Sequence, residues 1–124
     1  MPNPFVHVEL NTTDVKKAKD FYGKLFQWKL EDVPMGPMTY TMIQVGKDSG
    51  GVGGGIMQQQ HPGAPTAWLS YVVVDDIHES TKKARSLGAT IAQDVTPVAD
   101  MGIMSVIIDP TGGHLGLWQP KNQS

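Results

Sequence analysis

Apolar and polar residues alternate near the start of the chain, in the segment FVHVEL. This alternation predicts a β-strand over residues 5–10. Side chains two positions apart lie on the same face of a strand, so His7 and Glu9 share one face while Val8 and Leu10 share the other. We therefore expect a strand with one polar face and one apolar face.

The spacing of apolar residues then changes to that of a helix. Asp14 closes a run of residue types that cap helix N-termini, and Val15, Ala18 and Tyr22 follow at helical intervals. The pattern predicts an amphipathic helix over about residues 14–26.

Three further strands are expected before the middle of the chain. The first is short, the second is rich in β-forming residues and follows a turn signal at Met35-Gly36-Pro37, and the third is rich in glycine. They cover residues 27–31, 39–45 and 52–57, and a connector with two prolines, residues 58–66, follows them.

The second half repeats this order of elements. A strand over residues 67–74 leads to a helix with Asp75 and Asp76 at its N-terminus and Gly88 as its stop signal. The remaining strands are expected over residues 89–97, 102–108 and 114–118, with a turn at residues 109–113.

An offset of 62 residues superposes the two halves. It places Asp14 on Asp76 and Val15 on Ile77, so the repeat rests on pattern rather than identity. The expected fold class is α+β, with two βαβββ modules forming a curved mixed sheet around a concave pocket, and with the helices outside. We expect one domain over residues 1–124, with modules at about 4–58 and 66–120.

Composition and charge narrow the function classes. The chain has 124 residues, no cysteine and a formal net charge of -2. Disulfides and thiolate metal sites are excluded, and the lack of a basic face argues against a nucleic-acid partner. The N-terminus has no signal-peptide pattern, and no apolar run approaches the roughly 20 residues that span a bilayer. We expect no membrane partner and a cytoplasmic location.

Three segments carry a resemblance to a known family. They are HVELNTTDVKKAKDFYGKLFQW, WLSYVVVDDIHESTKKARSLGA and DPTGGHLGLWQP, and together they cover nearly the whole chain. In order and spacing they resemble the vicinal oxygen chelate superfamily of glyoxalases, bleomycin-resistance proteins and dioxygenases. The GGGIM and GLWQP segments are similar to its glyoxalase-like subgroup of poorly defined activity.

The resemblance implies where a metal would bind. Members hold one divalent metal with ligands on the first and last strands of each module. These positions correspond here to His7, Gly54, Leu69 and Gly116, so only one of the four can ligate a metal. A catalytic metal usually needs three protein ligands. We therefore expect no metal cofactor, although a divalent metal held by unusual ligands stays open.

His7 and Glu9 are the candidate catalytic residues, as an acid–base pair or a ligand anchor; the alternative is that they satisfy buried polar groups. Most of the seven methionines are expected to fill the core, although methionine also suits binding pockets. Tyr40, Tyr71 and Trp118 are candidates for a pocket wall. The expected ligand pocket consists of His7, Glu9, Gly54, Leu69, Tyr71, Gly116 and Trp118.

Three functions fit this reading. The first is a glyoxalase-like protein that binds an unknown small molecule in its pocket without a catalytic metal. The second is a divalent-metal-dependent lyase, isomerase or dioxygenase, or an enzyme that uses His7 and Glu9 without metal. The third is a stress or regulatory module with a vestigial pocket. The resemblance also implies a homodimer. Whether the chain is an enzyme, and which ligand it takes, stay open.

Overall fold

The computed structural model describes residues 2–121 and has an α+β fold, as expected. Its elements follow the predicted order of two βαβββ repeats. They are β1 (Phe5–Thr12), α1 (Val15–Leu25), β2 (Lys29–Met35), β3 (Met38–Gln44), β4 (Gly54–Gln58), β5 (Ala67–Val73), α2 (Ile77–Ser86), β6 (Thr90–Val98), β7 (Gly102–Ile108) and β8 (His114–Pro120).

The chain folds as two compact units. The N-terminal unit comprises residues 7–69, and the C-terminal unit comprises the described residues of 1–6 and 70–124. The division falls inside β1 and β5, so the first residues of β1 belong to the C-terminal unit. There the backbone oxygen of Pro4 accepts a hydrogen bond from the amide of Val73, at 3.0 Å.

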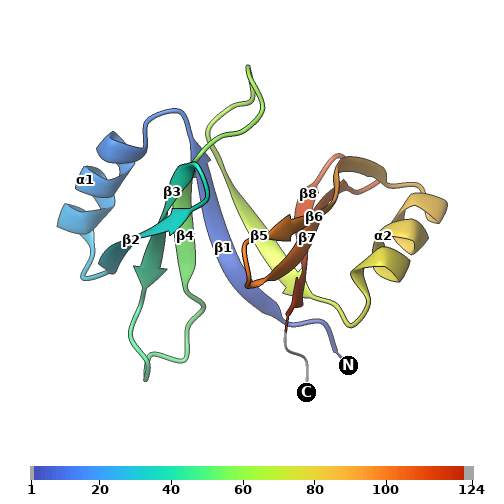
Figure 1. Ribbon diagram of the computed structural model, residues 1–124, viewed down its shortest axis with the longest axis horizontal. Coiled ribbons are helices and arrows are strands. Elements are labelled where there is room, and N and C mark those ends of the chain that lie inside the picture. Colours follow the sequence, from blue (N-terminus) through green and yellow to red (C-terminus); the bar gives the residue numbers. More distant parts are fainter. Residues whose placement is uncertain (1, 122–124) are drawn as a thin grey trace. The chain divides into compact units, whose positions relative to one another are not determined.

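In the N-terminal unit, four strands lie in the order β2-β3-β4-β1, and α1 packs on one face of them (Figure 1). β1 and β4 are parallel, and the other neighbouring strands are antiparallel. The core of the unit lies between the helix and this face, where Leu10, Ile43 and Ile56 are buried. Val15 and Tyr22 of α1 are partly buried against them.

Local chemistry explains why α1 begins where it does. The side chain of Asp14 accepts a hydrogen bond from the backbone amide of Lys17 at 3.0 Å, which satisfies one of the free N–H groups of the first turn. The predicted helix and its cap are thus confirmed.

In the C-terminal unit, the strand order is β5-β8-β7-β6, and α2 contacts β6, β7 and β8. Asp76 caps α2 by accepting from the amide of Glu79 at 3.2 Å, and Ile77 is fully buried beside Val72 and Leu117. Gly88 has a φ of 104°, which suits a glycine after a helix end and confirms the predicted stop.

The turn between β7 and β8 is held by one carboxylate. Oδ1 of Asp109 accepts hydrogen bonds from the hydroxyl and amide of Thr111 and from the amide of Gly113. These bonds hold the pKa of Asp109 below its usual range, and the bond from the Thr111 hydroxyl contributes most. The predicted turn at residues 109–113 is therefore confirmed.

Strand ends differ from expectation by a few residues. The strand expected over residues 27–31 begins at Lys29 and continues to Met35, where it forms a hairpin with β3. Within residues 2–121, neither helix is long and apolar enough to cross a membrane.

Candidate functional site

Three side chains of the N-terminal unit form a hydrogen-bonded chain. The hydroxyl of Tyr40 lies 2.6 Å from Nε2 of His7 and donates to Oε1 of Glu9 at 3.0 Å. Asn11 extends the chain, because its side-chain amide donates to Oε2 of Glu9 at 3.3 Å. An imidazole, a phenol and a carboxylate are therefore linked on one face of the strands.

Gly55 allows Tyr40 to reach His7 and Glu9. Tyr40 lies on β3 and the other two lie on β1, with β4 between these strands. Gly55 of β4 stands opposite Glu9 on one side and Met42 on the other. A Cβ atom on Gly55 would collide with the hydroxyl and ring of Tyr40. The missing side chain thus leaves the space through which Tyr40 crosses β4.

Burial affects the protonation of these hydrogen-bonded side chains. Glu9 is 8% exposed and Tyr40 is 6% exposed, while His7 is half-buried. Burial lowers the pKa of His7, because it disfavours the charged imidazolium. The phenol has one proton and donates it to Glu9, so its bond to His7 requires Nε2 of His7 to be the donor.

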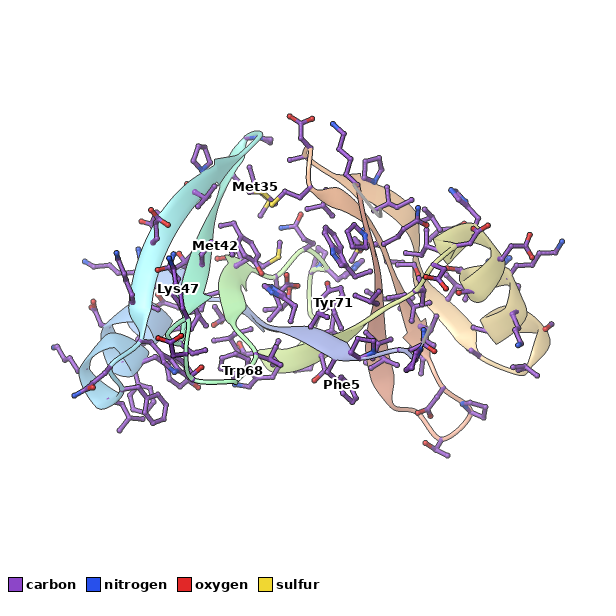
Figure 2. The ribbon with its side chains drawn as sticks, turned by 90° about the horizontal axis from the view of Figure 1, so that it is seen from below. Phe5, Met35, Met42, Lys47, Trp68 and Tyr71 are labelled. Carbon is purple, nitrogen blue, oxygen red and sulfur yellow. The ribbon has the colours of Figure 1, made fainter. Side chains whose placement is uncertain are left out.

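Methionine side chains share this face with Tyr40. The strand register places Met42 beside Gly55 and Met57 beside Asn11, and Met35 pairs with Met38 next to the β2–β3 turn. Met35 and Met42 are carried by this hairpin (Figure 2). All four are half-buried, and none belongs to the core cluster on the helix side. The expectation that most methionines fill the core is wrong for these four.

The predicted position of Gly54 needs a correction. Gly54 pairs with Val8, whose side chain is on the opposite face of β1 from His7 and Glu9. The residue on the face of Glu9 is Gly55, one position later. The sequence offset therefore selected the wrong glycine, because it assumed equal element lengths in both halves.

The other predicted pocket residues fall in both units. Leu69 is half-buried at the end of the N-terminal unit. In the C-terminal unit, Tyr71 pairs with Gly116, and a Cβ atom on Gly116 would collide with the Tyr71 ring. Trp118 lies opposite Met104 and is half-buried. Each unit thus has a tyrosine over a strand glycine.

Comparison with known proteins identifies the family. The model of the Glyoxalase/Bleomycin resistance protein/Dioxygenase superfamily matches residues 5–115. The chain belongs to this superfamily. Superfamily relatives in Mycobacterium bovis and Mycobacterium tuberculosis, both named "Putative glyoxylase CFP32", are 35% identical over 114 residues. The match covers 90% of this chain and 44% of each relative, so the chain spans less than half the length of these relatives.

Solved structures show the same fold. A hypothetical protein from Bacillus halodurans has a TM-score of 0.71 at 16% identity, with 100% of this chain and 99% of that chain covered. Methylmalonyl-CoA epimerase from Mycobacterium tuberculosis has a TM-score of 0.67 at 14% identity, with 94% and 87% covered. At this identity the two likenesses show the fold alone.

The donor set does not fit the divalent metal of the superfamily. Within the described residues 2–121, no three His, Asp or Glu side chains are grouped as a metal site requires. His7 and Glu9 are both engaged by Tyr40, and the β4 position between β3 and β1 is Gly55.

Tyr40 is the residue of this candidate site whose contacts the sequence did not predict. The sequence suggested it only as a pocket wall, because nothing local connects it to a residue 33 positions away. One signal was present: the glycine-rich strand leaves room on a sheet face for a large neighbouring side chain.

Proposed function

We propose that this superfamily member binds a small organic molecule on the face that carries His7, Tyr40 and Glu9, without a catalytic metal. One observation carries the proposal: the Tyr40 hydroxyl bonds both His7 and Glu9 of β1 and fills the space above Gly55. The polar groups are thereby fixed for recognition of a ligand rather than arranged around a cation.

The residues around the hydrogen-bonded His7, Tyr40 and Glu9 side chains suit an organic ligand. Binding sites are mostly apolar with a few placed polar groups, and methionine adapts its shape to bound molecules. Half-buried Met42 and Met57 provide the apolar part, and His7 with Asn11 provides polar groups beside them. The name of the mycobacterial relatives points to a carbonyl compound as a first class of ligand to test.

Metal content tests the absence of a cofactor. The chain is purified without metal-affinity resin or chelator, and bound metals are measured by mass spectrometry. We expect substoichiometric amounts of every divalent metal, and no rise in Tm when zinc, nickel, manganese or iron is added. Equimolar metal that disappears in the His7→Ala variant would contradict the proposal.

Ligand binding is tested by NMR of ¹³C-methyl methionine. Small ketones, aldehydes and aromatic carbonyl compounds are the probes. We expect at least one compound to shift the methyl signals of Met42 and Met57 while leaving exposed Met101, in the C-terminal unit, unchanged. The shift should weaken in Tyr40→Phe. Equal shifts of all methyls, or none with any compound, would count against a site on this face.

We also propose that two copies of the chain pair. The support is a group of exposed apolar side chains in the N-terminal unit, larger than isolated surface apolar residues explain. They are Phe21, Leu25, Phe26 and Trp68. Light scattering after size exclusion should give twice the 13.5 kDa of one chain, and Phe21→Ser should shift the mass toward the monomer. A wild-type mass of 13.5 kDa at high concentration would contradict pairing.

A further inference from the structure

We propose that Tyr40 is a selectivity residue: its hydroxyl bars divalent metal ions from His7 and Glu9 and reserves the site for organic ligands. This inference rests on the proposed function and adds the residue that determines it. Tyr40 would then be the side chain that makes this site differ from a metal-binding site.

The first argument is competition for the same two atoms. A metal ion would bind Nε2 of His7 and Oε1 of Glu9, and these are the atoms that Tyr40 engages, at 2.6 Å and 3.0 Å. Nε2 must be deprotonated to ligate a metal. As long as the phenol donates to Glu9, its bond to His7 needs a proton on Nε2. Metal binding would therefore require both hydrogen bonds to be broken.

The second argument concerns the missing third ligand. A side chain at position 55 would project toward the face of Glu9, because Gly55 and Glu9 are register partners on parallel strands. The Tyr40 hydroxyl and ring already occupy that space. Tyr40 thus engages the two potential ligands on β1 and excludes a third from β4.

Burial makes this arrangement persistent. Tyr40 and Glu9 are both less than a tenth exposed, so neither can readily exchange its partner for bulk water. Buried polar groups are costly to leave without hydrogen bonds, and an entering ion would have to compensate for that cost. An organic ligand that binds beside His7, Tyr40 and Glu9 does not need to break these hydrogen bonds.

The main test is zinc and nickel binding to Tyr40→Phe, measured by isothermal titration calorimetry. The variant keeps the ring but removes the hydroxyl. We expect affinity for either ion to rise by about tenfold or more over wild type, since two hydrogen bonds no longer oppose binding. Tyr22→Phe is the matched control: it removes a hydroxyl from a tyrosine of α1 and should leave metal affinity at the wild-type level. His7→Ala added to Tyr40→Phe should abolish the gain.

A second variant tests the space above β4. Tyr40→Ala combined with Gly55→Glu removes the phenol and adds a carboxylate that projects into the space it leaves. We expect this double variant to bind one zinc ion per chain and to lose it when His7→Ala is added. Circular dichroism of each variant shows whether it retains the wild-type fold.

The outcomes separate the two proposals. If both variants fold and neither binds zinc more tightly than wild type, the selectivity role of Tyr40 is overturned while metal-free ligand binding still stands. If wild type itself binds equimolar zinc through His7, both proposals fail. A visible absorption band with Fe³⁺ in wild type but not in Tyr40→Phe would identify Tyr40 as a metal ligand, which also overturns the inference.

Discussion

The hydroxyl of Tyr40 lies where a side chain on Gly55 would begin. Replacing Gly55 with alanine therefore forces Tyr40 to move and weakens its bonds to His7 and Glu9. We expect Gly55→Ala to lower the free energy of unfolding by about 1–3 kcal/mol, as overpacking of a close-packed region does. Urea denaturation followed by circular dichroism measures the change. Full wild-type stability in this variant would show that the Tyr40 side chain can adopt another conformation at no cost.

Replacing Gly23 with alanine should have the opposite effect on stability. It lies inside α1, where a Cβ atom would make an ordinary contact with Leu30 at 3.7 Å. Alanine is favoured over glycine in a helix by about 0.5–1 kcal/mol, so Gly23→Ala should raise the free energy of unfolding by that amount. The same urea experiment serves as the measurement. A loss of stability would mean that the helix packs more tightly at this point than the structure shows.

His7 should make stability depend on pH. Burial lowers its pKa in the folded state below the ordinary value of 6.5, so between these two values the unfolded chain binds more protons. The free energy of unfolding should therefore fall as the pH drops through 6.5 toward the lower, folded-state pKa. His7→Gln should remove this part of the slope in urea melts at a series of pH values.

A matched control for the pH experiment is His61→Gln. His61 is exposed in the connector between β4 and β5, away from Tyr40 and Glu9. The variant should keep the contribution of His7 to the pH slope. If His7→Gln and His61→Gln give the same profile as wild type, the burial of His7 has no thermodynamic effect.

A buried pair in the C-terminal unit tests its core. The hydroxyls of Thr81 on α2 and Ser105 on β7 are 2.9 Å apart, and both residues are almost fully buried. Thr81→Val keeps the shape but leaves the Ser105 hydroxyl without this bond, at a cost of about 1–3 kcal/mol. Adding Ser105→Ala should cost less than it does in wild type. Additive effects in this double-mutant cycle would show that the two hydroxyls do not depend on each other.

The helices were predictable because their signals are local. Asp14 and Asp76 each cap the helix that begins one residue later, and the apolar residues that follow have helical spacing. Capping and spacing involve residues a few positions apart, so the sequence contains all the information needed. For the same reason the offset of 62 residues holds for both helix starts.

The offset fails where element lengths differ. Counterparts defined by strand pairing are 64 residues apart for Met42 and Val106, and 61 apart for Gly55 and Gly116. The two halves have strands and loops of unequal length: β6 has 9 residues where β2 has 7. A constant offset cannot follow such changes, and a slip of one residue moves a strand position to the opposite face. A constant offset therefore points to Gly54, whereas Gly55 is the partner of Glu9.

The contacts of Tyr40 could not be predicted from local sequence patterns. Its partners are 31 and 33 positions away, and the contact depends on the order of three strands and on a glycine in the middle one. The pairing of β3 with β4 and of β4 with β1 brings these parts together. Sequence patterns identified His7 and Glu9 as neighbours on a face, but not the residue that joins them.

The collision between Tyr40 and any larger residue at position 55 also restricts the order in which these positions can change during evolution. A lineage that acquired a carboxylate at position 55 first would pass through a crowded and destabilised intermediate. A lineage that first lost the bulk at position 40 would not. The two positions are therefore epistatic, and homologous sequences should rarely combine tyrosine at the first with a bulky residue at the second.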